Sequence, residues 1–433
     1  MRHSGPVFCI FSCTAALTNS AAFAQNANPP PGYFDIPAGF DFPAQKATLE
    51  GYISSGNISA ERLHIWNVFA GMTQAAPGGN FAIFETWYSE PETFDPGSVV
   101  AFVARQPRLP RFQLPRQFLP PKGVVAAQVA GESVLSFVLY NFAGYNHVRS
   151  NGLFKNSTLD NLLENGLPNP TFPKDRDIPP FPQSAVSLKT VWWPIAKDRI
   201  TAMPIWDPDQ NPPSANGNPP NTWARYVAVD PTRINVPPDE FADVRYQNQT
   251  KHVHVVGSDK IHLVQVTADQ ASGVNSDGLL SQMAQAALGR PLQAGDFAAL
   301  VATHMTTKEI DNWVWATFWW HDRPDEGPFA SDRPGLVAGV WRNYLMAASY
   351  DLNLPREADG SPHVAFNPWL EARFPNGGHG GGVVSNCMNC HNRASYPNID
   401  FKPIYRGNPD PQDKAFDAGR LRTDFLWSIL NAQ

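Results

Sequence analysis

The segment SNCMNCHNRAS, residues 385–395, combines two thiols and an imidazole within one short stretch. Cys387 and Cys390 stand three positions apart, and His391 follows the second directly. Thiols at i and i+3 lie on neighbouring positions of one helical turn. Such a pair can act as a redox dithiol, contribute to a metal site, close a disulfide or bond covalently to a cofactor, and the imidazole beside it can ligate a metal ion.

The order C-x-x-C-H favours covalent attachment of haem. Two thiols on one turn can form thioethers with the two vinyl groups along one side of a porphyrin, while the adjacent imidazole reaches the iron as its proximal ligand. We therefore predict one covalently bound haem c, with Cys387 and Cys390 as the cofactor-binding residues and His391 as the iron ligand.

The other interpretations of the two thiols fit less well. A thioredoxin-like dithiol expects a strand before it and a βαβ pattern around it, whereas this pair follows the glycine-rich segment PNGGHGGG. A structural zinc site needs four ligands, and the sequence contains no second pair of this kind. A disulfide between Cys387 and Cys390 would close a loop too short to stabilise the chain much.

The segment around the motif resembles c-type cytochromes. That resemblance implies export through the general secretory route and haem attachment outside the cytoplasm. Upstream, SLKTVWW and ATHMTTKEIDNWVWATFWWHD are similar to stretches of large, poorly characterised bacterial cytochrome c family proteins that end in one such motif. This wider resemblance implies no particular reaction.

The sixth ligand of the iron is the point at which the sequence departs from small c-type cytochromes. In those proteins a methionine downstream of the motif supplies it, but the residues after His391 contain neither methionine nor histidine. A distal ligand must therefore come from upstream. The main candidates are Met346, in a predicted helix, and His379, in the glycine-rich segment; the others are His363, His321, His304 and Met305. Core packing, an exposed loop and hydrogen-bonded strand ends are the alternative roles for these residues.

The first residues have the features of a secretory signal peptide. A short basic start precedes the apolar run VFCIFSCTAAL, which is too short to span a membrane, and a small-x-small cleavage sequence ends at Ala24. We predict a signal peptide over residues 1–24, with lipid attachment at Cys13 as a weaker alternative. Cleavage after Ala24 would leave Cys387 and Cys390 as the remaining cysteines.

The mature chain is therefore predicted to be soluble and periplasmic, or otherwise exported, in an oxidising compartment. No later segment reaches the roughly 18 consecutive apolar residues that a membrane helix requires. The formal net charge over 433 residues is −6, which is not the excess of basic residues that nucleic-acid binding requires. The redox partner protein is not identified by the sequence.

Residues 25–335 are predicted to form a strand-rich body of unknown role with long proline-rich loops. The chain has 42 prolines, about twice the usual share of roughly 5%. β-Branched and aromatic residues predict strands in SAVSLKTVWWPI, RYVAVD, HVHVVGSDKIHLVQVT and FAALVATHMTTKEIDNWVWATFWWHD, with a hairpin at GSDK. Helical spacing appears in ERLHIWNVFAGM and in ESVLSFVLYNFAGYNHVRSNGLF.

Residues 336–433 are predicted to form a helical C-terminal haem-binding segment. GLVAGVWRNYLMAASYDL favours a helix before the motif, and DKAFDAGRLRTDFLWSIL favours an amphipathic helix after it. The expected architecture is α+β, with a boundary near residue 335. The four tryptophans of WVWATFWW are typical of a buried strand, and a second hypothesis places their indoles beside the porphyrin.

These features predict an exported monohaem c-type cytochrome that transfers single electrons. The alternative is a haem enzyme of the peroxidase or oxygenase kind, or a haem-based sensor, with an open coordination site on the iron. Two observations favour taking the alternative seriously. A body of roughly 300 residues precedes the motif, far more than carrying an electron needs, and no sixth ligand follows it.

Overall fold

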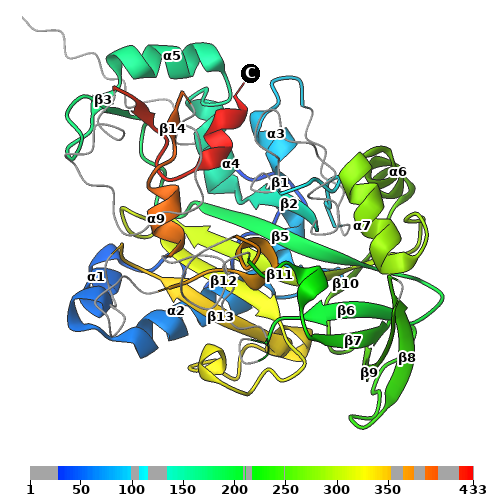
Figure 1. Cartoon of the computed structure of the whole chain (residues 1–433). Helices are drawn as coiled ribbons and strands as arrows, with labels where there is room; N and C mark the ends of the chain where they lie inside the picture. The colour runs from blue at the N-terminus through cyan, green and yellow to red at the C-terminus, as the bar shows by residue number, and fades with distance from the viewer. Residues whose placement is uncertain are drawn as a thin grey trace, which may run out of the picture.

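The computed structural model describes residues 28–98, 107–115, 134–207, 210, 217–247, 249–352, 364–374, 386–397 and 419–432. Within these ranges, helices surround three sheets whose strands are mostly antiparallel (Figure 1). This arrangement confirms the predicted α+β class. The predicted signal peptide, residues 1–24, and the histidines His363 and His379 lie outside the described residues.

A seven-stranded sheet forms the centre of the fold. Its strands run in the order β1 (Tyr88–Ser89), β2 (Leu135–Tyr140), β5 (Val186–Ile195), β11 (Phe297–Thr307), β12 (Val314–Trp320) and β13 (Tyr344–Ser349), and β10 (Leu263–Gln265) also pairs with β11. The three long strands β5, β11 and β12 are rich in Val, Thr and Trp, which pack well on a pleated surface. Because both faces are covered, every residue of β12 is buried.

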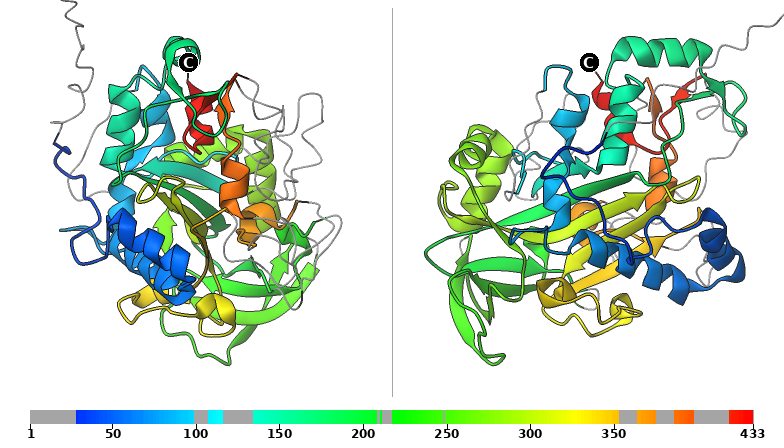
Figure 2. Two further views of the ribbon diagram at one scale, coloured as in Figure 1. Left: turned by 90° about the vertical axis from the view of Figure 1, so that its left-hand side faces the viewer. Right: turned by 180° about the vertical axis from the view of Figure 1, so that it is seen from behind.

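The two faces of this sheet have different cover. Phe318 of β12 and its register partner Met346 of β13 point to one face, where Phe69 of α2 (Ile58–Met72) stacks on Phe318 at 4.0 Å between ring centroids. Residues one position along those strands point to the other face. That second face is covered by α9 (Cys387–His391), which holds the C-x-x-C-H motif, so α2 and α9 lie on opposite sides of the sheet (Figure 2).

Two smaller sheets flank the central one. One has the order β6 (Thr201–Ile205), β7 (Arg225–Asp230), β9 (Gln249–Gly257) and β8 (Phe241–Tyr246); the other has the order β14 (Ser395–Tyr396), β15 (Leu421–Arg422), β4 (Arg176–Asp177) and β3 (Leu167–Pro168). The second of these sheets joins two segments that follow the C-x-x-C-H motif to residues far upstream. It therefore ties the C-terminal segment to the body.

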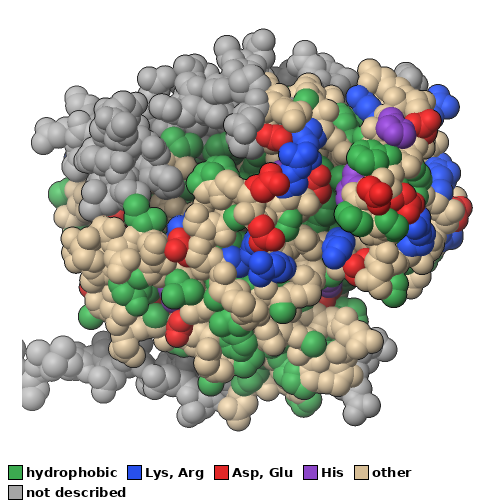
Figure 3. Space-filling model, turned by 90° about the horizontal axis from the view of Figure 1, so that it is seen from below, with side chains coloured by type: hydrophobic (Ala, Val, Ile, Leu, Met, Phe, Trp, Pro, Cys, Tyr) green, Lys and Arg blue, Asp and Glu red, His purple; other side chains and the backbone are tan. Residues whose placement is uncertain are grey.

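The remaining helices lie around the sheets. They are α1 (Lys46–Ser55), α3 (Glu90–Phe94), α4 (Phe142–Ser150), α5 (Asn156–Asn165), α6 (Ala268–Ser276), α7 (Gly278–Leu288) and α8 (Pro368–Glu371), with the 3₁₀ helix η8 (Trp427–Asn431) near the C-terminus. Among the described residues, no helix combines the length and the apolar character needed to cross a membrane. On the face shown in Figure 3, acidic and basic side chains are interspersed.

The helix predicted over residues 335–352 is wrong. Residues 344–349 form strand β13, which pairs with β12 over its whole length. The short apolar run YLMAAS fits a strand buried on both faces as well as it fits a helix, and pairing with the edge of β12 decides between them. Strand β13 extends the sheet of the body beyond residue 335. The domain boundary near residue 335 stays a prediction.

Three other local predictions also differ from the structure. The segment ESVLSFVLYNFAGYNHVRSNGLF contains a helix as predicted, α4, but this helix begins only at Phe142, and residues 135–140 are strand β2. The strands on either side of GSDK do not form a hairpin, because β9 pairs with β7 and β8 whereas β10 pairs with β11. The described part of the predicted C-terminal helix contains strand β15 and η8.

Candidate functional site

The cysteine motif lies on the short helix α9, and side-chain amides fix that helix to the central sheet. Asn386 caps it by accepting a hydrogen bond from the backbone N–H of Asn389 at 3.2 Å. The amide of Asn386 donates to the carbonyl of Asp351 at 3.3 Å, and the amide of Asn389 donates to that of Leu352 at 3.1 Å. Both carbonyls follow the end of β13, so the sheet sets the position of the two thiols.

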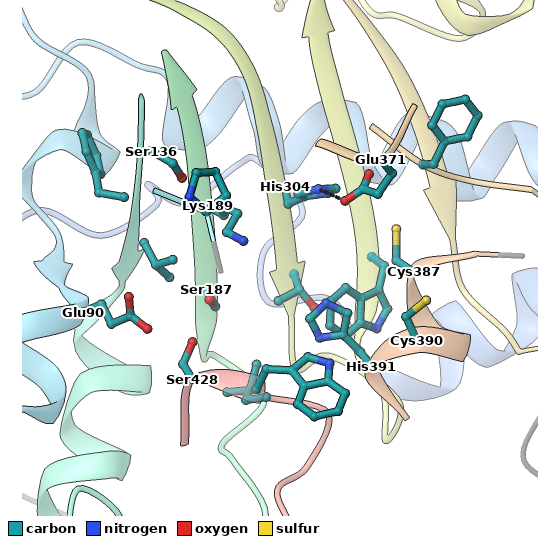
Figure 4. Close-up of a pocket in the computed structure, with 18 of the residues that line it drawn as sticks. Glu90, Ser136, Ser187, Lys189, His304, Glu371, Cys387, Cys390, His391 and Ser428 are labelled. Carbon is teal, nitrogen blue, oxygen red and sulfur yellow. Dashed lines mark hydrogen bonds and ion pairs between the residues drawn. The ribbon is translucent and has the colours of Figure 1, made fainter. Parts of the chain in front are cut away.

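A cavity of about 480 Å³ lies between α9 and the second face of the sheet (Figure 4). Its volume is within the range of roughly 300–1,000 Å³ in which proteins bind compact organic ligands. Cys387, Cys390 and His391 all line it. The central sheet contributes Ser136, Val138, Ser187, Lys189, His304, Thr306 and Trp315, and further apolar side chains come from Phe366, Phe374, Leu426 and Leu430.

Both cysteines are free thiols that remain protonated at neutral pH. Burial, reinforced by the negative charge of Glu371, raises the pKa of Cys390 to about 12 and also raises the pKa of Cys387. A catalytic dithiol needs the opposite shift, because the thiolate is the nucleophile. The environment of these thiols therefore does not suit disulfide exchange, whereas an uncharged thioether is well accommodated there.

The imidazole of His391 has one nitrogen already engaged. Its Nδ1 lies 2.8 Å from the backbone carbonyl of Phe425, which can only accept a hydrogen bond, so Nδ1 carries the proton. Burial lowers the pKa of His391 to about 3, against the opposing effect of that hydrogen bond. The ring is therefore neutral at physiological pH, and Nε2 keeps its lone pair. A neutral imidazole fixed through its other nitrogen is the usual form of a metal-ligating histidine.

The loop that presents the Phe425 carbonyl is held in an uncommon conformation. Asp424 and Phe425 have φ angles of 47° and 68°, in the left-handed region that residues other than glycine rarely occupy. The carboxylate of Asp424 accepts hydrogen bonds from Lys308 Nζ at 2.6 Å and from the backbone N–H of Phe181 at 3.2 Å. Residues distant in sequence thus hold the carbonyl that orients His391.

Trp315 packs against the imidazole ring of His391. Its ring centroid lies 4.2 Å from that of His391, and its indole N–H donates to the carbonyl of Asn312 at 2.9 Å. Trp315 belongs to the WVWATFWW segment and lines the cavity. Trp319 instead packs against Phe329, and the indole of Trp320 donates to the carbonyl of Lys260.

A second polar group lies across the cavity from His391. His304 of β11 and Glu371 of α8 are joined by a hydrogen bond of 3.0 Å between Nε2 and Oε1. In Figure 4, this pair is drawn above His391, and the two cysteines lie to the right of both. Lys189 of β5 is the register partner of His304 and shares its face of the sheet.

The structure separates the predicted distal ligands. Met346 lies on the face of the sheet opposite to the cavity, where its sulfur is 3.9 Å from the Arg62 guanidinium. Met305 points to the same side as Met346, because it adjoins His304 on β11. His321 accepts a hydrogen bond from the backbone N–H of Arg323 and does not line the cavity. Of the candidates within the described residues, His304 is the one that lines it.

Sequence reasoning missed several residues of this site. Glu371 and Lys189 are single charged residues without a motif, and the Phe425 carbonyl belongs to the backbone, so no spacing rule points to them. His304 is one of the predicted distal-ligand candidates, but the sequence favours a hydrogen-bonded role at a strand end for it, whereas it lies in the interior of β11. The alternation of His304 and Thr306 on one face of that strand was the available signal.

The donor set fits haem better than a metal centre built from protein ligands alone. A porphyrin supplies four nitrogens, so its iron needs one or two protein ligands, and two neutral thiols beside a neutral imidazole match covalent attachment. Within the described residues, no three or more His, Cys, Asp or Glu side chains gather closely enough to hold a metal ion. No family model, curated protein or solved structure matches this chain.

Proposed function

We propose that this protein is an exported monohaem c-type cytochrome that carries single electrons. Haem would be bound through thioethers to Cys387 and Cys390, with His391 Nε2 as the proximal iron ligand. The observation that supports this most strongly is the hydrogen bond from His391 Nδ1 to the Phe425 carbonyl. It leaves a neutral nitrogen with a lone pair beside two protonated thiols and a cavity of about 480 Å³.

The chain's own residues would hold, orient and shield the cofactor. When bound, haem supplies an iron that alternates between two oxidation states one electron apart. Trp315 packs on the imidazole of His391 and would restrict its rotation, and the apolar side chains Phe366 and Phe374 of the cavity lining would keep water from the cofactor. Lys189 and Ser187 provide polar contacts on the sheet side that suit the carboxylates of a porphyrin.

Covalent attachment is the most direct test of this proposal. Holo-protein, produced with export and haem attachment intact, is denatured and separated on a gel, and haem that stays with the polypeptide is detected. We expect wild type to retain it, Cys387→Ser and Cys390→Ser to retain less, and the double variant to lose it. Absence of covalent haem from the folded, exported wild type would refute the proposal.

His391→Ala tests the proximal ligand, and His321→Ala is its matched control, because His321 is also a buried histidine but does not line the cavity. We expect a changed absorption spectrum only in His391→Ala. A potentiometric titration of the wild type should follow a one-electron curve. The mass of the secreted protein tests export, since cleavage before Gln25 leaves a chain that begins at that residue.

A second candidate function is binding of a small ligand to the iron, as in a haem enzyme or sensor. The observation that favours it is the engagement of His304 Nε2 with Glu371, because this histidine is then unavailable as a sixth ligand in the arrangement described. Addition of carbon monoxide to the reduced protein distinguishes the two functions. An unchanged spectrum favours a firmly ligated electron carrier, and a prompt shift favours ligand binding.

A further inference from the structure

We infer that Glu371 keeps His304 from ligating the iron, so that no second histidine of the described cavity lining competes there with a small external ligand of the size of carbon monoxide. This inference rests on the haem attachment proposed above, and of the two candidate functions it favours the second, binding of a small ligand to the iron. It assigns a role to the two residues of the cavity that the attachment itself does not use. Glu371 is the positioning residue in this arrangement, because its carboxylate fixes the orientation of His304.

The hydrogen bond between the two side chains determines which nitrogen of His304 is protonated. A carboxylate can only accept, so the 3.0 Å contact requires the proton on Nε2. Oε2 of Glu371 accepts from the backbone N–H of Asn367 at 2.5 Å, which fixes the carboxylate at the start of α8. A protonated nitrogen has no lone pair to donate to iron, so Nε2 can ligate only after it leaves Glu371.

The other nitrogen of His304 is poorly placed to replace Nε2. Nδ1 adjoins the ring carbon that bears the side chain, so it lies close to strand β11. Lys189 on β5 and Thr317 on β12 are the register partners of His304, and both flank it on the same face of the sheet. A group as broad as a porphyrin would meet these neighbours before its centre reached Nδ1.

The size of the cavity limits what can occupy the free position. Haem has about 43 non-hydrogen atoms and is among the larger ligands that occupy cavities of roughly 300–1,000 Å³. A cavity of about 480 Å³ lies in the lower part of that range, so we expect any second ligand bound beside haem to be small. The charge of Glu371, held near the thiols, makes an anion less favourable there than a neutral molecule.

The test is carbon monoxide binding to the reduced holo-protein, followed by the visible spectrum. We expect the wild type to bind it promptly and to show a high-spin or water-ligated oxidised form. In Glu371→Ala, Nε2 is released and can turn to the iron. If the form in which His304 binds the iron then makes up 90–99% of the population, the apparent affinity for carbon monoxide falls about 10- to 100-fold. The oxidised spectrum then becomes low-spin.

Two further variants separate this effect from a general disturbance of the site. Glu371→Gln keeps an oxygen that accepts from Nε2, so we expect wild-type behaviour. The double variant Glu371→Ala/His304→Ala has no imidazole to bind the iron, so we expect the affinity to return to the wild-type range. Recovery in the double variant excludes loss of α8 as the cause of the change in Glu371→Ala.

Four results would overturn the inference while leaving haem attachment intact. If the wild type does not bind carbon monoxide and a variant without His304 does, His304 is the sixth ligand. If neither the wild type nor any of the variants binds carbon monoxide, the sixth ligand comes from elsewhere in the chain. An equal affinity for carbon monoxide in wild type and Glu371→Ala would show that Glu371 has no such role. The same conclusion would follow if the affinity of the double variant did not return to the wild-type range. Absence of covalent haem would instead refute the proposed function itself.

Discussion

Replacement of Lys308 by methionine should weaken both the fold and the orientation of His391. The ammonium of Lys308 binds the Asp424 carboxylate at 2.6 Å, and their side chains are only 8% and 13% exposed. Removing one partner of a buried ion pair typically costs about 3–5 kcal/mol, because the other charge is left without compensation. Asp424 keeps its hydrogen bond from Phe181, so we expect the lower end of that range, about 3 kcal/mol.

The free energy of unfolding, measured by urea denaturation, gives the first readout. Lys46→Met is the matched control, since Lys46 pairs with Asp311 at a site where the two side chains are 34% and 82% exposed. Exposed pairs contribute at most about 1 kcal/mol. The second variant, Lys308→Met/Asp424→Asn, removes both charges and should be less destabilised than Lys308→Met alone.

The reduction potential gives the second readout, and it depends on the proposed haem. Asp424 and Phe425 both occupy the left-handed region, at a typical cost of about 1–3 kcal/mol each, which the surrounding contacts must sustain. If the loop relaxes, His391 loses the acceptor of its Nδ1 proton and becomes a weaker electron donor to the iron, so the potential should rise. Equal stability losses in Lys308→Met and Lys46→Met would refute the reasoning about the ion pair, and an unchanged potential would refute its connection to His391.

Three other predictions follow from contacts near the site. Met346→Leu should leave the haem spectrum unchanged and cost less than about 1.5 kcal/mol, since Met346 is a core residue on the far face of the sheet; a spectral change would make it a ligand after all. Asn386→Ala should cost about 1–2 kcal/mol through loss of the α9 cap, and a stability equal to that of wild type would show that the cap is not needed. Burial raises the pKa of Glu61 from 4.5 to about 7, so the folded state binds its proton more tightly than the unfolded state does, and stability should fall as the pH rises from about 4.5 to above 7. Glu61→Gln should remove this dependence and stabilise the protein by about 3 kcal/mol at pH 8, with little change at pH 4; an equal effect at both pH values would contradict the shift.

The sequence alone determined the α+β class and the long strands of the body. β-Branched and aromatic residues identify β5, β11 and β12 because such side chains pack on a sheet whichever strand pairs with which. It also predicted that the chemistry lies at Cys387, Cys390 and His391, since i, i+3 and i+4 positions on one helical turn are neighbours before any tertiary contact forms. These inferences depend on local geometry, which the spacing of residues fixes.

Tertiary structure decided which residues surround that motif. Met346 was expected to lie on a helix near the haem, but the free edge of β12 makes its segment a strand and places its side chain on the face covered by α2. The partners of the motif come from distant parts of the chain. The Phe425 carbonyl accepts the proton of His391 Nδ1, and His304 and Glu371 form a hydrogen bond in the lining of the cavity. Each contact depends on how segments far apart in sequence pack together. No local pattern encodes a pairing of that kind, because its energy appears only once both segments are in place.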